Sequence, residues 1–239
     1  MANERFPSTR LSLIRIAVQG SNDESRQALT TLCRLYWYPL YAFVRREGYR
    51  PDEAQDLTQA FFTRLLEKKY LRDYERDRGR FRSFLLASLK HFLSNERDRA
   101  NAQKRGGGAS LLSLDAVIQA GELRYSLEPR SELTPDKLFE RQWALTVIDR
   151  VITRLQAESD QIGKGPLFER MKPYLAGAET RTPYTELARQ LNTTEGALKV
   201  AVHRLRLRFR EILRSEIAQT VAHPDEVQEE IRYLVSILM

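Results

Sequence analysis

The sequence predicts an all-α protein in which a flexible linker joins two helical domains, the second containing a helix-turn-helix. In almost every segment, apolar residues recur at spacings of three and four, the period of an α-helix with one buried face. No stretch alternates apolar and polar residues as a half-buried strand would. The helical pattern breaks near the middle of the chain, around three consecutive glycines. We therefore expect domains over residues 1–105 and 135–239, with the linker at 106–134.

Three helices are expected in the first domain. The first runs from about Glu24 to Gly48, a stop signal, and Pro39 predicts a kink or a break within it. The second begins at Asp52 and the third after Gly79. The residues expected to face the core are Leu29, Leu32, Tyr36, Leu40 and Phe43 in the first helix, Ala54, Leu57, Phe61 and Leu65 in the second, and Phe81, Phe84, Leu85, Leu89 and Phe92 in the third.

Proline and glycine mark the helices of the second domain. Thr134 followed by Pro135 opens a long helix, because proline is well tolerated in a first turn. The segment from Gly163 to Pro166 then interrupts the pattern. Beyond the helix-turn-helix treated next, further helices are expected at 167–175, 211–221 and 224–238.

The segment 184–210 has the layout of a helix-turn-helix. A first helix has small and apolar residues on one face, and it ends at Asn192, a residue that tolerates the left-handed conformation of a tight turn. Thr193 and Thr194 offer hydroxyls to cap the next helix. In that second helix the predicted buried stripe is formed by Leu198, Val202, Leu205 and Phe209.

The side of the second helix away from this stripe is basic. It carries Gly196, Val200, His203 and Arg204, with Lys199, Arg206 and Arg210 flanking them. A short helix with one apolar and one basic face, held by a partner helix, fits a DNA major groove. The alternative is a solvated basic helix in an ordinary helical bundle.

Charge is distributed unevenly along the chain. Its formal net charge is +7, but residues 60–105 alone sum to +7 and residues 196–214 to +5. Two separate basic blocks suit a protein that touches nucleic acid at two places. The C-terminal residues 215–239 sum to −4. One hypothesis is that this acidic segment folds back to screen the basic recognition helix; extra packing of a small domain is the alternative.

Other classes of function find little support in the sequence. Cys33 is the sole cysteine, the three histidines are scattered, and the triple glycine lacks the sequence context of a phosphate-binding loop. Asp52, Glu53 and Asp56 could bind a divalent ion, but acidic residues at a helix N-terminus are more simply explained by the helix dipole. We expect no enzyme activity, no cofactor and no metal, and a soluble cytoplasmic protein without a membrane-spanning segment.

Three stretches, in this order, resemble the extracytoplasmic-function (ECF) type of RNA polymerase sigma factors, within the sigma-70 family. Residues 52–66 are similar to the family's polymerase-binding helix. Residues 79–99 are similar to the helix that melts and reads the −10 promoter element, and residues 184–208 to the helix-turn-helix that reads the −35 element. The resemblance implies a sigma factor that binds core RNA polymerase, at the β′ clamp helices and the β flap, and promoter DNA, both as duplex and as melted single strand. An anti-sigma partner is compatible with it, and no membrane contact is expected.

The candidate site residues combine this resemblance with the helical faces. For polymerase binding they are Asp52, Asp56, Gln59, Phe62 and Thr63, with a core position as the alternative for Phe62. For the −10 element they are Arg76, Arg80, Arg82, Lys90, His91, Asn95, Arg97 and Arg99, where cations can track phosphates beside aromatic residues. For the −35 element they are Thr194, Lys199, Val200, His203, Arg204 and Arg206.

The sequence also departs from the family pattern. It has Val200 and Ala201 where the family has a small polar residue followed by arginine, so the usual −35 preference is not expected. An alternative function is a self-sufficient helix-turn-helix regulator that binds duplex DNA as a dimer. Its dimer seam would be the C-terminal helix, through Val227, Ile231 and Leu234.

Overall fold

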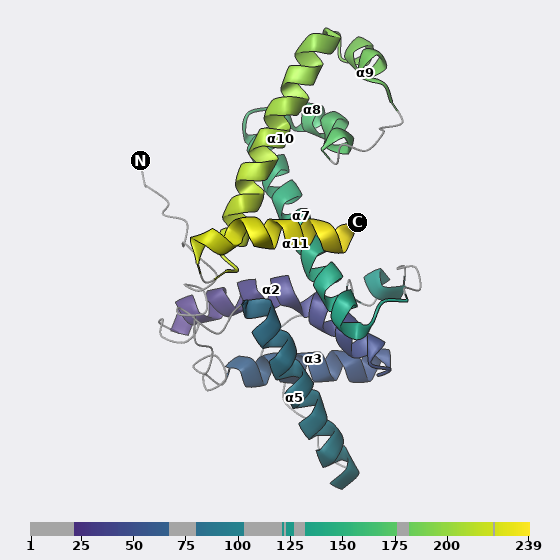
Figure 1. Ribbon diagram of the computed structural model, residues 1–239, viewed down its shortest axis with the longest axis vertical. Coiled ribbons are helices and arrows are strands. Elements are labelled where there is room, and N and C mark those ends of the chain that lie inside the picture. Colours follow the sequence, from purple (N-terminus) through teal and green to yellow (C-terminus); the bar gives the residue numbers. More distant parts are fainter. Residues whose placement is uncertain are drawn as a thin grey trace. The chain divides into compact units, whose positions relative to one another are not determined.

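The computed structural model describes residues 22–66, 80–102, 121, 123–126, 132–175, 182–221 and 223–239. All of the regular secondary structure in these ranges is helical, as the sequence predicts (Figure 1). The chain divides into two compact units, one made of Met1–Thr146 with Ile217–Met239 and the other of Val147–Glu216.

These units have bounds other than those of the predicted domains. The first division falls within helix α7 (Pro135–Gln161) rather than at residues 106–134, and the second falls near the end of helix α10 (Glu195–Ala218). The C-terminal segment was predicted to extend the second domain, but it belongs to the first unit. The position of this segment directly after α10 in the sequence therefore does not decide where it packs.

The first unit begins with two helices that pack against each other, α2 (Asn22–Arg46) and α3 (Pro51–Leu66). Gly48 lies between them with a φ of 96°, a left-handed conformation that glycine adopts readily. Of the kink or break expected at Pro39, the break does not occur, because α2 runs through this residue. The predicted stop at Gly48 is confirmed.

Helix α5 (Phe81–Ala102) completes the aromatic core of the first unit. The ring of Phe81 meets Tyr36 of α2 edge-on at 5.5 Å between centroids, and Phe92 lies 5.7 Å from Phe61 of α3. These four rings are almost fully buried, so they account for much of the apolar surface that folding removes from water.

Part of the predicted linker packs on this core. Gly121 is buried, and residues 123–126 are helical. A Cβ atom added at Gly121 would come within 2.4 Å of the Trp37 ring, so only glycine permits this close approach. Tyr125 lies edge-on to Tyr41, 6.3 Å between ring centroids. The helix expected at 111–120 lies outside the described residues.

The first part of α7 and the C-terminal helix α11 (Val227–Leu238) close the first unit, the latter preceded by a 3₁₀ turn, Pro224–Glu226. Helix α7 begins at Pro135 as predicted, and the Thr134 hydroxyl accepts a bond from the Lys137 amide at 3.4 Å. Trp143 of α7 and Leu234 of α11 are buried. The terminal helix α11 therefore buries an apolar residue inside this unit.

The second unit has a small core of its own. Its elements are the rest of α7, α8 (Gly165–Met171), the 3₁₀ turn Lys172–Tyr174, α9 (Tyr184–Gln190) and most of α10. The fully buried members of the core are Met171, Tyr174, Leu187, Ala188, Leu198 and Val202. Helix α10 is continuous to Ala218, so the separate helix predicted to begin at residue 211 is instead part of α10.

None of the helices in the described ranges is both long enough and apolar enough to cross a bilayer.

Candidate nucleic-acid interface

The turn between α9 and α10 is built as the sequence predicts. Asn192 has a φ of 49°, in the left-handed region that asparagine tolerates. The amide of Thr193 donates to the Ala188 carbonyl at 3.0 Å, which satisfies a carbonyl at the end of α9. The Thr194 hydroxyl accepts a bond from the Ala197 amide at 3.1 Å and so caps α10. Local chemistry therefore determines the path of the chain into α10.

The outer face of α10 is exposed and carries most of the predicted −35 residues. Thr194, Lys199, His203 and Arg204 are exposed, and Val200 is 50% exposed. Leu198 and Val202 of the same helix are buried against α9. Five of the six predicted −35 residues, these four and Val200, are therefore accessible on one side of the unit.

Arg206 is the exception in this group. Its Nε and Nη2 atoms donate to the Tyr174 carbonyl at 3.0 and 2.6 Å, and the side chain is half-buried. Arg206 comes four residues after the buried Val202, so it lies at the edge of the core face. Its guanidinium anchors α10 to the end of the 3₁₀ turn, and the prediction of an outward-facing DNA contact is wrong for this conformation.

Two exposed cations of α10 form ion pairs. Lys199 pairs with Glu195 at 2.5 Å, and this hydrogen bond raises the pKa of the lysine. Arg208 is held by Glu158 and Glu211, both at 2.8 Å, and these bonds raise the pKa of the arginine. The exposed cations of α10 that form no ion pair with any described residue are Arg204, Arg210 and Arg214. These three arginines make the outer side of α10 electropositive.

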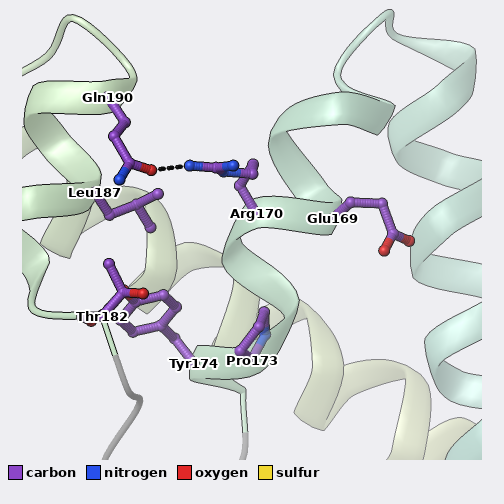
Figure 2. A pocket seen from close by; sticks show the side chains of 7 residues that line it. All are labelled: Glu169, Arg170, Pro173, Tyr174, Thr182, Leu187 and Gln190. Atoms are coloured by element: carbon purple, nitrogen blue, oxygen red, sulfur yellow. Dashed lines mark hydrogen bonds between the residues drawn. The ribbon is translucent and has the colours of Figure 1, made fainter.

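A hollow of about 480 Å³ separates α9 from α8 and the 3₁₀ turn (Figure 2). Arg170 reaches across it to hydrogen-bond the Gln190 side chain, as the dashed line shows. On its other side the Tyr174 hydroxyl donates to the Thr182 carbonyl at 2.6 Å. The polar lining is thus engaged in holding α9 in place, which in turn positions α10.

Of the predicted −10 residues that the structure describes, Arg80 directly precedes α5 and the others lie on α5, and most of their charges are paired. Arg80 bonds Glu230 at 2.7 Å and Glu229 at 3.1 Å, and Arg82 also pairs with Glu230. Arg82 is only 3% exposed, so the expectation that it faces DNA is wrong for this conformation. It lies three residues before the buried Leu85, hence on the core face of α5.

The remaining predicted −10 residues divide into paired cations and neutral exposed groups. Lys90 pairs with Asp136 at 2.6 Å, and Arg99 with Glu96 at 2.9 Å. Arg97 bonds Glu47 and the Tyr49 hydroxyl, both at 2.8 Å, and these bonds raise its pKa. The neutral groups are His91 and Asn95, both exposed. Arg76 lies outside the described residues.

The predicted polymerase-binding face of α3 is more polar than expected. Phe62 is 1% exposed and packs edge-on against Phe61, so its placement on the outer face is wrong. It lies four residues after the buried Thr58 and three before Leu65, on the core face. The rest of the predicted group is Asp52 and Asp56, which are exposed, and Gln59 and Thr63, which are half-buried.

Four residues around Arg82 were not predicted as functional. Its guanidinium lies 4.5 Å from the centre of the Trp143 ring and 4.8 Å from that of Tyr233. Tyr233 in turn hydrogen-bonds Glu140. The sequence does contain a signal for this cluster. Glu230 falls on the apolar stripe of α11, three residues after Val227. A carboxylate there must be buried with a partner.

The acidic C-terminal segment has a different partner from the one hypothesised. Its residues Glu229 and Glu230 engage Arg80, directly before α5, and Arg82 of α5, so these carboxylates do not serve to screen α10. Burial lowers the pKa of Arg82, and the neighbouring Arg80 lowers it further.

No group of three or more His, Cys, Asp or Glu side chains suited to hold a metal ion occurs in the described ranges. Comparisons with protein-family models, with curated proteins and with solved structures find no match. The function is therefore inferred from the residues themselves.

Proposed function

We propose that this protein is a promoter-recognition subunit of bacterial RNA polymerase, a sigma factor of the ECF type, without catalytic activity of its own. The observation that carries the proposal is the outer face of α10. There Val200, His203 and Arg204 are exposed on a helix that α9 and a capped turn hold in place. Arginine and histidine can donate to base edges in a major groove, and a valine can contact a thymine methyl group.

The proposal includes the capture of a melted DNA strand by the first unit. His91 and Asn95 are exposed one helical turn apart on α5, and both can hydrogen-bond an unpaired base. Arg97 and Lys90 lie on the same helix, partly exposed in their ion pairs. A phosphate can replace the carboxylate in such a pair, because surface ion pairs contribute little free energy.

Docking to the polymerase is proposed through the outer face of α3. With Phe62 in the core, this face is acidic and polar, with Asp52 and Asp56 most exposed. Charge complementarity with basic residues of the β′ clamp helices would then supply orientation and association rate more than affinity. A protein that acts at bacterial promoters would work in the cytoplasm, so the proposal includes this location.

Run-off transcription with core RNA polymerase on a library of promoter fragments tests this function. Transcripts that start only in the presence of the protein are the expected result, and the aligned start sites then reveal both promoter elements. The matched control is a double substitution, V200A with R204Q, which removes two proposed base contacts. Both side chains are exposed, so the fold should not depend on them. The absence of any protein-dependent transcript would refute the proposal.

The alternative, a dimeric regulator that acts without polymerase, loses the observation that favoured it. The seam would need the apolar stripe of α11 to be free, but Val227 and Leu234 are buried within the first unit and Ile231 is half-buried. Tight binding to duplex DNA by the protein alone, with no new transcripts, would restore this alternative.

A further inference from the structure

Helix α11 covers two arginines with carboxylates. Glu230 is fully buried and bridges Arg80 and Arg82, while Glu229, 71% exposed, adds a second contact to Arg80 at 3.1 Å. Tyr233, one turn further along α11, places its ring over Arg82. One face of a short helix thus supplies acceptors and an aromatic ring to the first turn of α5.

The surface beneath α11 is rich in hydrogen-bond donors. The Tyr36 hydroxyl, Trp143 Nε1 and Arg82 Nε are buried and have no hydrogen-bond partner among the described residues. The two carboxylate oxygens of Glu230 also lack hydrogen-bond geometry and meet the arginines as ion pairs. The Trp143 ring lies against the Arg82 guanidinium, and while burial lowers the pKa of Arg82, the electrostatic interaction with Tyr36 raises it. Buried donors without a hydrogen bond are rare in folded proteins, and these three show that the carboxylates of α11 do not satisfy the donors beneath them.

The same surface offers rings as well as donors. Phe84 lies one turn from Arg80 on α5, is half-buried and stacks on Phe81 at 6.0 Å between centroids. With α11 removed, Arg82 would lie against the Trp143 ring, and Arg80 would lie one turn from Phe84. Guanidinium groups next to aromatic faces are the combination that binds the phosphates and bases of a single strand.

We propose that α11 is a built-in competitor of a nucleic-acid strand. Glu229 and Glu230 occupy the places of two phosphates on Arg80 and Arg82, and the helix leaves when a single strand binds there. The assignment of that strand to an opened promoter rests on the proposed function. The competition itself rests on the contacts of α11.

The docking of α11 is suited to reversal. The helix has 12 residues, a length at which a helix depends on tertiary packing. Its central contact is a buried ion pair, whose attraction is largely offset by the desolvation of both charges. A strand that brings several phosphates can therefore displace it without unfolding α5.

The experiment measures binding of a fluorescent single-stranded oligonucleotide to the full chain by anisotropy. Glu230→Gln and Glu230→Lys weaken or abolish the docking of α11. Asp225→Asn and Asp225→Lys make the same changes of charge at an exposed position with no ion pair to a described residue. We expect the Glu230 variants to bind on the order of tenfold more tightly than the unsubstituted protein, and the Asp225 controls to bind within about twofold of it.

Adding Arg82→Gln to Glu230→Gln should remove the gain, since the gain depends on the uncovered arginine. A gain in oligonucleotide affinity that survives Arg82→Gln would overturn the proposal. The proposal would also be overturned if the Glu230→Lys variant bound the oligonucleotide no better than the Asp225→Lys control.

A second measurement uses the unsubstituted protein. Hydrogen exchange of residues 227–238 should become faster when the oligonucleotide saturates the protein, while exchange in α10 stays the same or slows. Unchanged protection of α11 at saturation would also overturn the proposal. Transcription separates the two inferences: start sites without competition refute only the competitor, and competition without start sites refutes only the sigma-factor function.

Discussion

Helices α5 and α10 are both rich in arginine and were both predicted to read DNA, yet they display their charge differently. In α5 and at Arg80 directly before it, the described cations meet carboxylates: Arg80 and Arg82 meet those of α11, and Arg97 meets Glu47. In α10, Arg204 and Arg210 are exposed without an ion pair to any described residue. A count of charges along the sequence scores the two helices alike, because it ignores where acids from distant segments arrive.

The difference also separates two uses of arginine. Arg82 lies between two aromatic rings in the core of the first unit, where a planar guanidinium packs as well as pairs. Arg204 lies on the surface, where it adds to the field that attracts a polyanion. With α11 docked, the first use stabilises the fold, and the second prepares a surface for binding.

The largest expected effect tests whether the arginine of α5 is structural. Arg82→Met should lower the free energy of unfolding by about 3 kcal/mol, because it leaves Glu230 buried with Arg80 as its one remaining partner. Arg97→Met removes a pair that is half exposed and should cost less than about 1 kcal/mol. Urea unfolding of both variants measures the contrast, and equal losses would contradict it.

The second prediction makes the same contrast within α10. Leu198→Ala removes a buried side chain from a small core and should cost about 2–3 kcal/mol. Val200→Ala, two residues away and half exposed, should change stability by less than about 0.5 kcal/mol. Thermal unfolding followed by circular dichroism compares the two. A large loss at Val200 would mean that its side chain is covered in solution.

The third prediction concerns duplex binding and rests on the proposed function. Arg204→Gln should weaken binding to the selected promoter by about 1–3 kcal/mol, the range for an arginine that reads a base. Arg214→Gln removes the same charge about 15 Å further along the helix axis, so it should reduce affinity about twofold. Titrations of holoenzyme at several salt concentrations measure both. Similar losses at the two positions would indicate a general electrostatic effect instead of base readout.

The smallest effect uses Cys33 as a reporter of the first unit alone. Burial raises the pKa of this thiol from 9.0 to about 12. The unfolded thiol loses its proton at lower pH than the folded one. Its contribution to stability is therefore complete below pH 9 and is lost as pH rises from 9 to 12.

Native protein at pH 8 should react with iodoacetamide only as fast as the first unit opens. Cys33 is the sole cysteine, so labelling reports on the first unit alone. Leu198 belongs to the second unit, so Leu198→Ala should leave this rate unchanged, whereas Arg82→Met in the first unit should raise it. Rapid labelling of the unsubstituted protein would contradict the burial of Cys33.

Predictions from the sequence succeeded where neighbours along the chain decide the structure. Gly48 ends α2, Pro135 begins α7, and Asn192 with Thr194 shapes the turn before α10. Each of these acts through backbone conformation or a hydrogen bond to an amide a few residues away. The exposure of Val200 followed in the same way from the helical period.

Predictions failed where a distant segment supplies the partner. A stripe drawn through Leu57 left Phe62 outside, although the core reaches Thr58 and Phe62 of α3 as well. Arg206 was assigned to DNA because the Tyr174 carbonyl, 32 residues earlier, cannot be foreseen as its acceptor. In each case the helix was placed correctly and its rotation or its contacts were not.

By itself, the sequence determined that the chain is helical, where most helices begin and end, and that one face of α10 is basic, because these depend on interactions between residues a few positions apart. Tertiary structure alone decided that α11 packs in the first unit and that Glu230 meets Arg80 and Arg82, about 150 residues away. A buried charge requires an opposite charge beside it, and only the folded chain selects which one. The same sequence-level count of arginines therefore describes a closed surface on α5 and an open one on α10.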